Sequence, residues 1–191
     1  HVRSRRQRQM CIRDSYSFDQ FSNQLIEIIN DLKIKDYSIV GQSLGGHIAI
    51  QALRLLNDPP KKLFLFGTPP MEKPLTLSPF NEVQEMGLLL ESELNNNQAC
   101  LLRSSFINNP DHFEPFQIAS ILNTDPKFRT QFLPFVLAGN YKDELTELEN
   151  YTGDMAICFG EEDKLISKDY YQNKIESLPL KVFKQSGHNI N

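Results

Sequence analysis

The apolar residues of the chain recur first with the period of a helix and later in short continuous runs. From Ser17 to Leu32 they stand three or four positions apart, which predicts an amphipathic helix with Ser17 and Gln20 in capping-box relation. Short apolar runs predict buried strands at residues 36–40, 63–66, 155–159 and 180–184. Two longer stretches predict helices, at residues 47–56 and 168–178. Strands that alternate with helices indicate an α/β fold, with a parallel sheet covered by helices on both faces.

The stretch from residue 71 to 150 interrupts this alternation. It has helical patterning, proline-led helix starts at Ser78-Pro79 and Asp125-Pro126, and no convincing strand. The three asparagines at 95–97 are interpreted as a loop between two of its helices. The sequence therefore predicts a core made of residues 15–70 and 151–191, with a helical cap inserted at residues 71–150.

The first fourteen residues differ from the rest in composition and pattern: they contain five arginines and show no apolar periodicity. A basic arm for nucleic acid is one interpretation. We prefer another, because residues 5–14 (RRQRQMCIRD) look like the translation of a sequencing adapter, which makes 1–14 a non-native segment. The remaining chain holds 15 Lys and Arg against 23 Asp and Glu, a formal net charge of −8, so no nucleic-acid partner is expected. On this interpretation the native N-terminus, with its early strands, is missing.

Composition narrows the class of protein further. A chain of 191 residues, 40% hydrophobic and 23% charged, is long enough for one globular domain. It contains no run of 18 apolar residues, so no membrane span is predicted. Its three cysteines lack metal or disulfide spacing, which favours a reducing, cytoplasmic compartment, and Cys158 is interpreted as a small core residue.

A G-x-S-x-G pattern, Gly41-Gln42-Ser43-Leu44-Gly45, lies between a predicted strand and a predicted helix. In that context the pattern is typical of a nucleophile elbow, which presents the serine at the top of a sharp turn. Gly41 and Gly45 are predicted to stand where a side chain would clash, because strand and helix crowd together there.

A serine hydroxyl needs a base to take its proton and a third group to orient that base. Asp163 lies just past the predicted strand at 155–159, and His188 lies just past the last predicted strand. Ser43, Asp163 and His188 thus follow one another in the order serine, acid, histidine. Glu162 is the alternative for the acid.

Three segments together resemble the α/β-hydrolase superfamily: GQSLGGH at 41–47, GEEDKLI at 160–166 and SGHNI at 186–190. The resemblance implies that Ser43 is the nucleophile, His188 the general base and acid, and Asp163 the carboxylate that orients the histidine. It also implies that the Leu44 backbone N–H is one donor of the oxyanion hole. The family's second donor and its strands before the elbow have no counterpart here, so we expect this fragment to be a poor enzyme.

The other histidines have plainer interpretations. His47 is expected to pack or hydrogen-bond locally at the start of its helix, and His112 to be exposed in the insertion. Neither the spacing of the histidines nor that of the cysteines matches a metal motif, so no metal or other cofactor is predicted.

Seven of the 13 phenylalanines fall in the insertion, at positions 80, 106, 113, 116, 128, 132 and 135. Most of these rings are expected to pack the cap's own core, with one or two facing Ser43 in an apolar substrate pocket.

These observations predict a serine hydrolase that cleaves an ester, thioester or similar acyl bond through an acyl-enzyme. The expected partner is a small to medium, uncharged or hydrophobic acyl substrate. An acyltransferase, a C–C hydrolase and an iminopeptidase share the same triad, and a non-catalytic ligand-binding protein can share the same fold. These remain alternatives.

Overall fold

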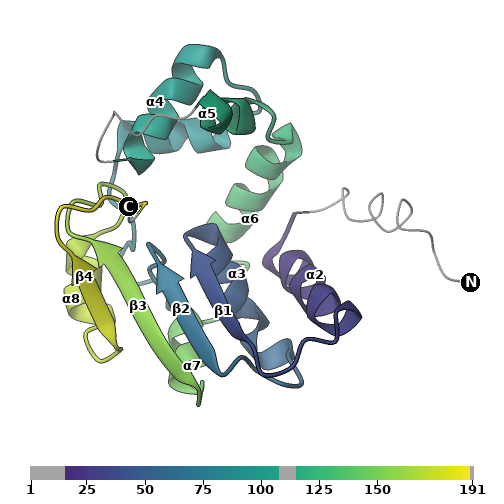
Figure 1. The fold of residues 1–191 in the computed structure, drawn as a ribbon. Coiled ribbons are helices and arrows are strands. Elements are labelled where there is room, and N and C mark those ends of the chain that lie inside the picture. Colours follow the sequence, from purple (N-terminus) through teal and green to yellow (C-terminus); the bar gives the residue numbers. More distant parts are fainter. Residues whose placement is uncertain (1–15, 108–114, 190–191) are drawn as a thin grey trace, which may run out of the picture.

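A parallel sheet of four strands forms the centre of the protein (Figure 1). The structure is a computed structural model that describes residues 16–107 and 115–189. Its strands, in both chain and spatial order, are β1 (Ser38–Gln42), β2 (Lys62–Phe66), β3 (Asp154–Gly160) and β4 (Leu180–Phe183). All neighbouring pairs are parallel. The predicted strands and the α/β class are therefore confirmed, with β1 shifted two residues beyond the predicted run.

Among the described residues, four α-helices belong to the core: α2 (Phe18–Asp31), α3 (Leu44–Ala52), α7 (Glu144–Glu149) and α8 (Lys168–Lys174). The Ser17 side chain caps α2, because its Oγ accepts a hydrogen bond from the Gln20 backbone N–H at 3.2 Å. Helix α3 begins earlier than predicted and passes into the 3-10 turn η1 (Leu53–Leu55). In the parts of the chain that the structure describes, no helix combines the length and apolarity needed to cross a membrane.

The main hydrophobic core lies on one face of the sheet. Alternate side chains of β2 and β3 point to this face because the side chains of a strand alternate in direction. They are Leu63, Leu65, Ile157 and Phe159, all at most 1% exposed, and they pack against α3, α7 and α8. Cys158 is also fully buried, as predicted. This packing holds the two central strands in place, and with them the loops at their carboxyl ends.

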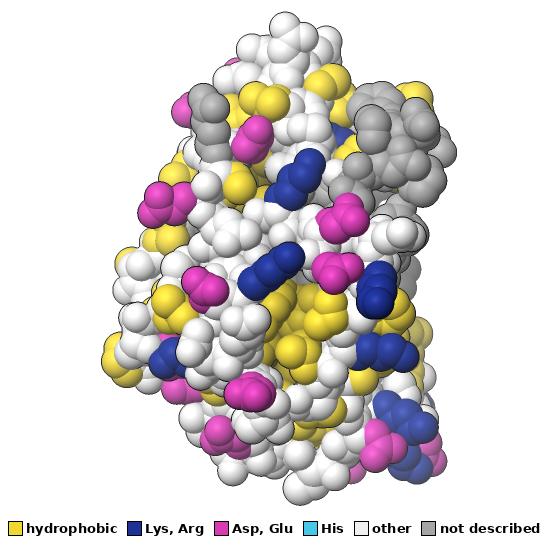
Figure 2. All heavy atoms as spheres, turned by 90° about the vertical axis from the view of Figure 1, so that its left-hand side faces the viewer, with side chains coloured by type: hydrophobic (Ala, Val, Ile, Leu, Met, Phe, Trp, Pro, Cys, Tyr) yellow, Lys and Arg dark blue, Asp and Glu magenta, His cyan; other side chains and the backbone are white. Residues whose placement is uncertain are grey.

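The helices cover this face better than the other. Val40 points to the opposite face and is 69% exposed, and in Figure 1 the core helices α3 and α7 lie behind the sheet. At the β4 edge the cover is thin as well, since Val182 is 52% exposed. Figure 2, seen from the side of β4 and α8, shows hydrophobic side chains exposed on the surface among separate charged side chains. Helices therefore flank the described sheet, and they cover one face more fully than the other.

The insertion lies beyond the carboxyl ends of the strands (Figure 1). Its helical elements are η2 (Gln84–Leu90), α4 (Asn96–Phe106), α5 (Pro115–Leu122), η4 (Phe128–Phe132) and α6 (Leu133–Leu137). A helix begins at Pro126, as predicted, and it continues through η4 into α6.

Two predictions within the insertion are wrong. Ser78-Pro79 does not start a helix; the chain bends at Pro79, and Phe80 forms an isolated antiparallel bridge with Ile166. The asparagines at 95–97 are not a loop either. Asn95 is the N-cap of α4, in a capping box with Gln98, and the next two asparagines form the first turn. A pattern that predicts turns also suits caps, because both need short polar side chains that accept backbone hydrogen bonds.

Candidate active site

Ser43 stands at the junction of β1 and α3, with no loop between strand and helix. Its backbone has φ 49° and ψ −121°, a strained conformation for a residue with a side chain. Two contacts with the end of β2 hold it there. The Ser43 N–H donates to the Phe66 carbonyl at 2.8 Å, and the Thr68 hydroxyl donates to the Ser43 carbonyl at 3.0 Å. The junction is therefore a sharp elbow fixed by the neighbouring strand.

The glycines of the elbow differ from the prediction at one position. A Cβ on Gly41 would lie 2.6 Å from the Gly46 Cα, so Gly41 is crowded as expected. A Cβ on Gly45 would meet nothing within 4 Å, whereas one on Gly46 would collide with the Thr68 side chain. The prediction for Gly45 is wrong because Gly46, one residue further along α3, faces the end of β2. Gly45 faces open space.

Asp163 lies in the loop that follows β3. One carboxylate oxygen, Oδ1, accepts hydrogen bonds from the backbone N–H groups of Leu165 and Ile166 at 2.8 and 3.2 Å. The other, Oδ2, lies 2.9 Å from Nδ1 of His188. Asp163 is 6% exposed and His188 is 3% exposed. The carboxylate is therefore buried, but all of its contacts are with hydrogen-bond donors, which is the condition for burying a charge.

His188 connects Asp163 to Ser43. Its Nε2 lies 2.9 Å from the Ser43 Oγ, across 145 positions of sequence. A carboxylate only accepts hydrogen bonds, so the proton of the neutral imidazole belongs on Nδ1, facing Asp163. Nε2 is then an acceptor for the Ser43 hydroxyl. The structure thus brings the three predicted residues together in an order that allows proton transfer from Ser43.

The alternative acid does not occupy this place. The Glu162 backbone N–H donates to the Ser186 carbonyl at 2.9 Å, and the side chain that faces His188 is that of Asp163. Gln42 makes a further link between the elbow and the histidine loop, since its Nε2 donates to Asn189 Oδ1 at 2.8 Å. Leu44 is the first residue of α3, and the N–H groups in the first turn of a helix have no acceptor within that helix.

His47 is buried, but its hydrogen bond is not local. Its Nδ1 lies 2.8 Å from Glu144 Oε2, across 97 positions of sequence. The same Oε2 accepts the Met71 N–H at 2.9 Å, and Oε1 accepts from Gln51 Nε2 at 2.9 Å. Met71 is the first residue of the predicted insertion and Glu144 is the first residue of α7, and the Glu144 N–H donates to the Met71 carbonyl at 2.8 Å. The expectation of a local contact is therefore wrong: His47 ties α3 to the base of the insertion.

The phenylalanines of the insertion pack differently from the prediction. Phe128 and Phe132 stack on each other and contact Phe21 of α2, so they join the insertion to the core and do not fill a separate cap interior. Phe106 of α4 lies beside the candidate site, with its ring 5.7 Å from that of His188. Phe116 is 65% exposed. The expected positions of His112 and Phe113 lie outside the described residues.

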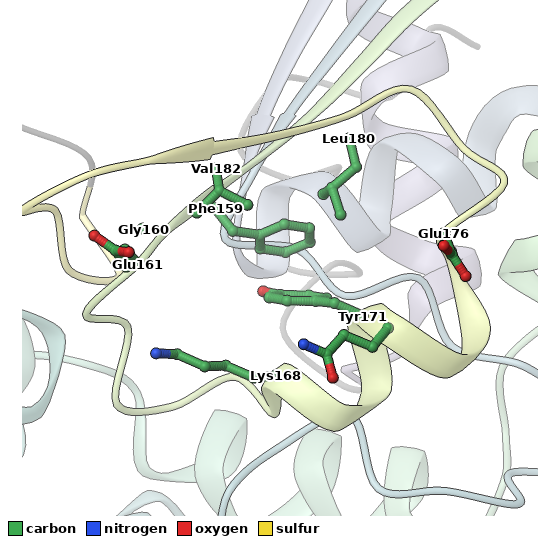
Figure 3. Close-up of a pocket in the computed structure, with 9 residues that line it drawn as sticks. Phe159, Gly160, Glu161, Lys168, Tyr171, Glu176, Leu180 and Val182 are labelled. Atoms are coloured by element: carbon green, nitrogen blue, oxygen red, sulfur yellow. The ribbon is translucent and has the colours of Figure 1, made fainter.

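A hollow of about 450 Å³ lies between α8 and β4 (Figure 3). Phe159 and Tyr171 form its apolar floor, and Lys168 and Glu176 stand at its rim. Burial, together with the nearby Asp163 charge, raises the pKa of Tyr171. Neither Ser43 nor His188 lines the hollow, so a molecule bound there would not reach the serine.

Sequence reasoning missed the residues that support the triad from other elements. Thr68 and Gly46 carry no local motif, although Gly46 directly follows the predicted elbow. Phe106 is one of the seven phenylalanines of which one or two were expected to face Ser43, and its ring lies beside His188. Within the described residues, no group of three or more histidine, cysteine or acidic side chains is placed to hold a metal ion.

Comparison with solved structures gives the fold a class. A structure of the N-acyl homoserine lactonase AidH, complexed with N-butanoyl homoserine, matches with a TM-score of 0.80 at 21% identity, over 91% of this chain and 64% of that chain. The esterase EaEST from Exiguobacterium antarcticum matches with a TM-score of 0.72 at 20% identity, over 92% of this chain and 68% of that one. The 2-hydroxy-6-oxo-6-phenylhexa-2,4-dienoate hydrolase of Rhodococcus sp. strain RHA1 matches with a TM-score of 0.68 at 19% identity. This match covers 90% of this chain and 64% of that chain.

The protein therefore has an α/β-hydrolase fold. The chain spans about 64% of the length of the lactonase structure. No family model matches the sequence, and no curated protein matches it. The structural similarity thus identifies the fold alone. Any inference about the chemistry depends on the residues at the elbow.

Proposed function

We propose that the protein is a serine hydrolase that cleaves an acyl bond through an acyl-enzyme. One observation carries the proposal: the continuous contact from the Ser43 Oγ to His188 Nε2, and from His188 Nδ1 to Asp163 Oδ2, with each step 2.9 Å long. In this proposal Ser43 attacks the substrate carbonyl while His188 takes its proton. His188 then gives that proton to the leaving group. Water activated by His188 releases the acid and regenerates the serine.

The remaining roles follow from position. Asp163 holds the Nδ1 proton of His188 and stabilises the imidazolium that forms. The Leu44 N–H, at the start of α3, would donate to the developing oxyanion. The substrate would be a small to medium, uncharged or hydrophobic ester, thioester or similar acyl compound. This substrate class is supported by the Phe106 ring beside His188, and by a lactonase, an esterase and a C–C hydrolase among the proteins with the same fold.

The test is labelling with a fluorophosphonate probe, which reacts only with an activated serine. We expect the probe to attach to Ser43, with the site read by peptide mass spectrometry, and the Ser43→Ala variant to remain unlabelled. Ser22→Ala is a matched control, because Ser22 is a buried serine of α2 that has no part in the proposed triad. Equal labelling of wild type and Ser43→Ala would sink the assignment. A labelled serine that turns over no acyl ester would favour the non-catalytic or acyltransferase alternatives.

A further inference from the structure

The loop that carries Asp163 is held from outside the core by a segment of the insertion. Phe80 pairs with Ile166 in an antiparallel bridge, and the Ser167 N–H donates to the Pro79 carbonyl at 3.0 Å. This is the segment in which the sequence predicts a helix start. The bridge brings the next residue, Asn81, against the loop.

Asn81 donates three hydrogen bonds, one to each of three consecutive backbone carbonyls of this loop. Its side-chain Nδ2 donates to the carbonyls of Lys164 and Ile166, at 3.0 and 2.9 Å. Its backbone N–H donates to the carbonyl of Leu165 at 2.8 Å. An asparagine amide has two N–H donors and the backbone has one, so these contacts use its full set.

The same peptide groups bind Asp163 on their other side. The Lys164 carbonyl belongs to the same peptide plane as the Leu165 N–H, and the Leu165 carbonyl to the same plane as the Ile166 N–H. Those two N–H groups donate to Asp163 Oδ1, at 2.8 and 3.2 Å. A peptide group is planar and trans, so its carbonyl and its N–H point in opposite directions. Fixing the carbonyl with Asn81 therefore aims the N–H at Asp163.

We propose that Asn81 is a positioning residue for the triad. Asn81 acts only through the peptide planes that hold Asp163. This inference rests on the proposed function for its effect on reactivity, although the contacts themselves do not depend on it. Hydrogen bonds in a chain also polarise one another, so donation to the carbonyl strengthens the N–H as a donor to the carboxylate. The insertion thereby contributes to the triad without touching the reacting atoms.

The first experiment measures the loop and needs no catalysis. Asn81→Ala removes both side-chain donors; Asn81→Asp keeps the shape, removes the same donors and places a carboxylate against two carbonyls. We expect amide hydrogen exchange at Leu165 to be at least about tenfold faster in both variants, because its peptide plane loses the Asn81 side chain from the Lys164 carbonyl. Exchange at Ile166 should change less, because the Asn81 backbone N–H still holds the Leu165 carbonyl. Asn140→Ala is the matched control, since Asn140 donates to the Phe135 carbonyl within the insertion. Unchanged exchange at Leu165 in both Asn81 variants would overturn the proposal.

The second experiment asks whether Asn81 acts through Asp163. We expect Asn81→Ala to lower the rate of Ser43 labelling by about 10- to 100-fold, as loss of a supporting partner does at other sites. In an Asp163→Asn background the same change should lower it by less than about threefold, because the residue through which it acts is already lost. An equal loss in both backgrounds would overturn the proposal. If the wild type is not labelled at all, the proposed function fails, and the exchange measurement still decides the role of Asn81.

Discussion

The protein contains two buried histidine–carboxylate pairs that look alike in isolation. His188 Nδ1 lies 2.9 Å from Asp163, and His47 Nδ1 lies 2.8 Å from Glu144. Both histidines are at most 6% exposed. The pairs differ in what else lies near each ring. His188 has the Ser43 hydroxyl at 2.9 Å, whereas the His47 ring has the rings of Phe18 and Phe80, with centroids 6.3 and 6.5 Å away.

The carboxylates differ as well. Asp163 is held by two backbone N–H groups of its own loop, so it stays next to one strand end. Glu144 accepts from His47, Gln51 and Met71, which lie on α3 and at the start of the insertion. One pair thus orients a base toward a nucleophile, and the other joins distant segments. A buried histidine with an acid is therefore not by itself a sign of catalysis; the group beyond the ring decides.

The largest expected effect separates the two histidines. His188→Ala should reduce Ser43 labelling to background, because removing a triad base costs about 10⁶-fold in the hydrolases where it has been measured. His47→Ala should leave the labelling rate of the folded protein within about tenfold, since removing this ring takes a donor from Glu144 and leaves the relay in place. Labelling kinetics under native conditions check both variants. Equal loss in the two would mean that the pairs do not differ in the way described.

The next effect distinguishes the two acidic residues beside His188. Asp163→Asn should lower the labelling rate by about 10⁴-fold, because an amide cannot keep the Nδ1 proton in place as a carboxylate does. Glu162→Gln is the matched control and should change the rate far less, as His188 Nδ1 faces Asp163. The same labelling assay, followed over time, gives both rates. The reverse outcome would transfer the acid role to Glu162.

The third prediction concerns stability. Glu144→Gln should lower the free energy of unfolding by about 3 kcal/mol, because an amide nitrogen would face donors that now meet a carboxylate oxygen. Glu149→Gln, an exposed change in the same helix, should cost less than about 0.5 kcal/mol. Urea unfolding followed by circular dichroism measures both. A small loss for Glu144→Gln, similar to that of Glu149→Gln, would show that the pair with His47 does not hold the base of the insertion.

The smallest expected effect is on the pH dependence of stability, and it concerns Glu72, which follows Met71 at the base of the insertion. Burial raises the pKa of Glu72, but hydrogen bonds from Thr76 and Lys174 outweigh it and lower the pKa from 4.5 to about 2. A carboxyl with a lowered pKa in the folded state adds stability that is present in full above the unfolded pKa and is lost as the pH falls. The contribution of Glu72 should therefore fade between pH 4.5 and about pH 2.

The Glu72→Gln variant tests this prediction. Its stability should fall less steeply than that of the wild type over the same acid range, as measured by urea unfolding at a series of pH values. Glu82→Gln, in an exposed part of the insertion, is the control that should follow the wild type. Identical slopes for Glu72→Gln and wild type would contradict the lowered pKa.

Much of the core could be predicted from the sequence because its signals are local. The runs at 63–66 and 155–159 are apolar, short and bounded by turn residues, and they became β2 and β3. The elbow at Ser43 could be predicted because a strand, a sharp turn and a helix leave a pattern of five adjacent residues. The closeness of Asp163 and His188 could be predicted because both follow strand ends, and parallel strands bring those ends to one edge.

The failures occur where distant contacts outweighed local preference. Ser78-Pro79 has the pattern of a helix start, but its segment lies against the loop after β3. Gly45 matches the motif, yet Gly46 is the glycine that the end of β2 crowds. His47 looks like a local contact in its helix, yet its partner, Glu144, lies 97 positions away.

By itself, then, the sequence determined the alternation of strands and helices, the place of the elbow and the order of Ser43, Asp163 and His188. These depend on hydrophobic period and turn chemistry, which act over a few residues. Only the tertiary structure decided that His47 pairs with Glu144, which glycine is crowded and how Asn81 reaches the loop of Asp163. Those depend on atoms brought within hydrogen-bond distance by folding, and no local pattern records these contacts between segments 83 to 97 positions apart.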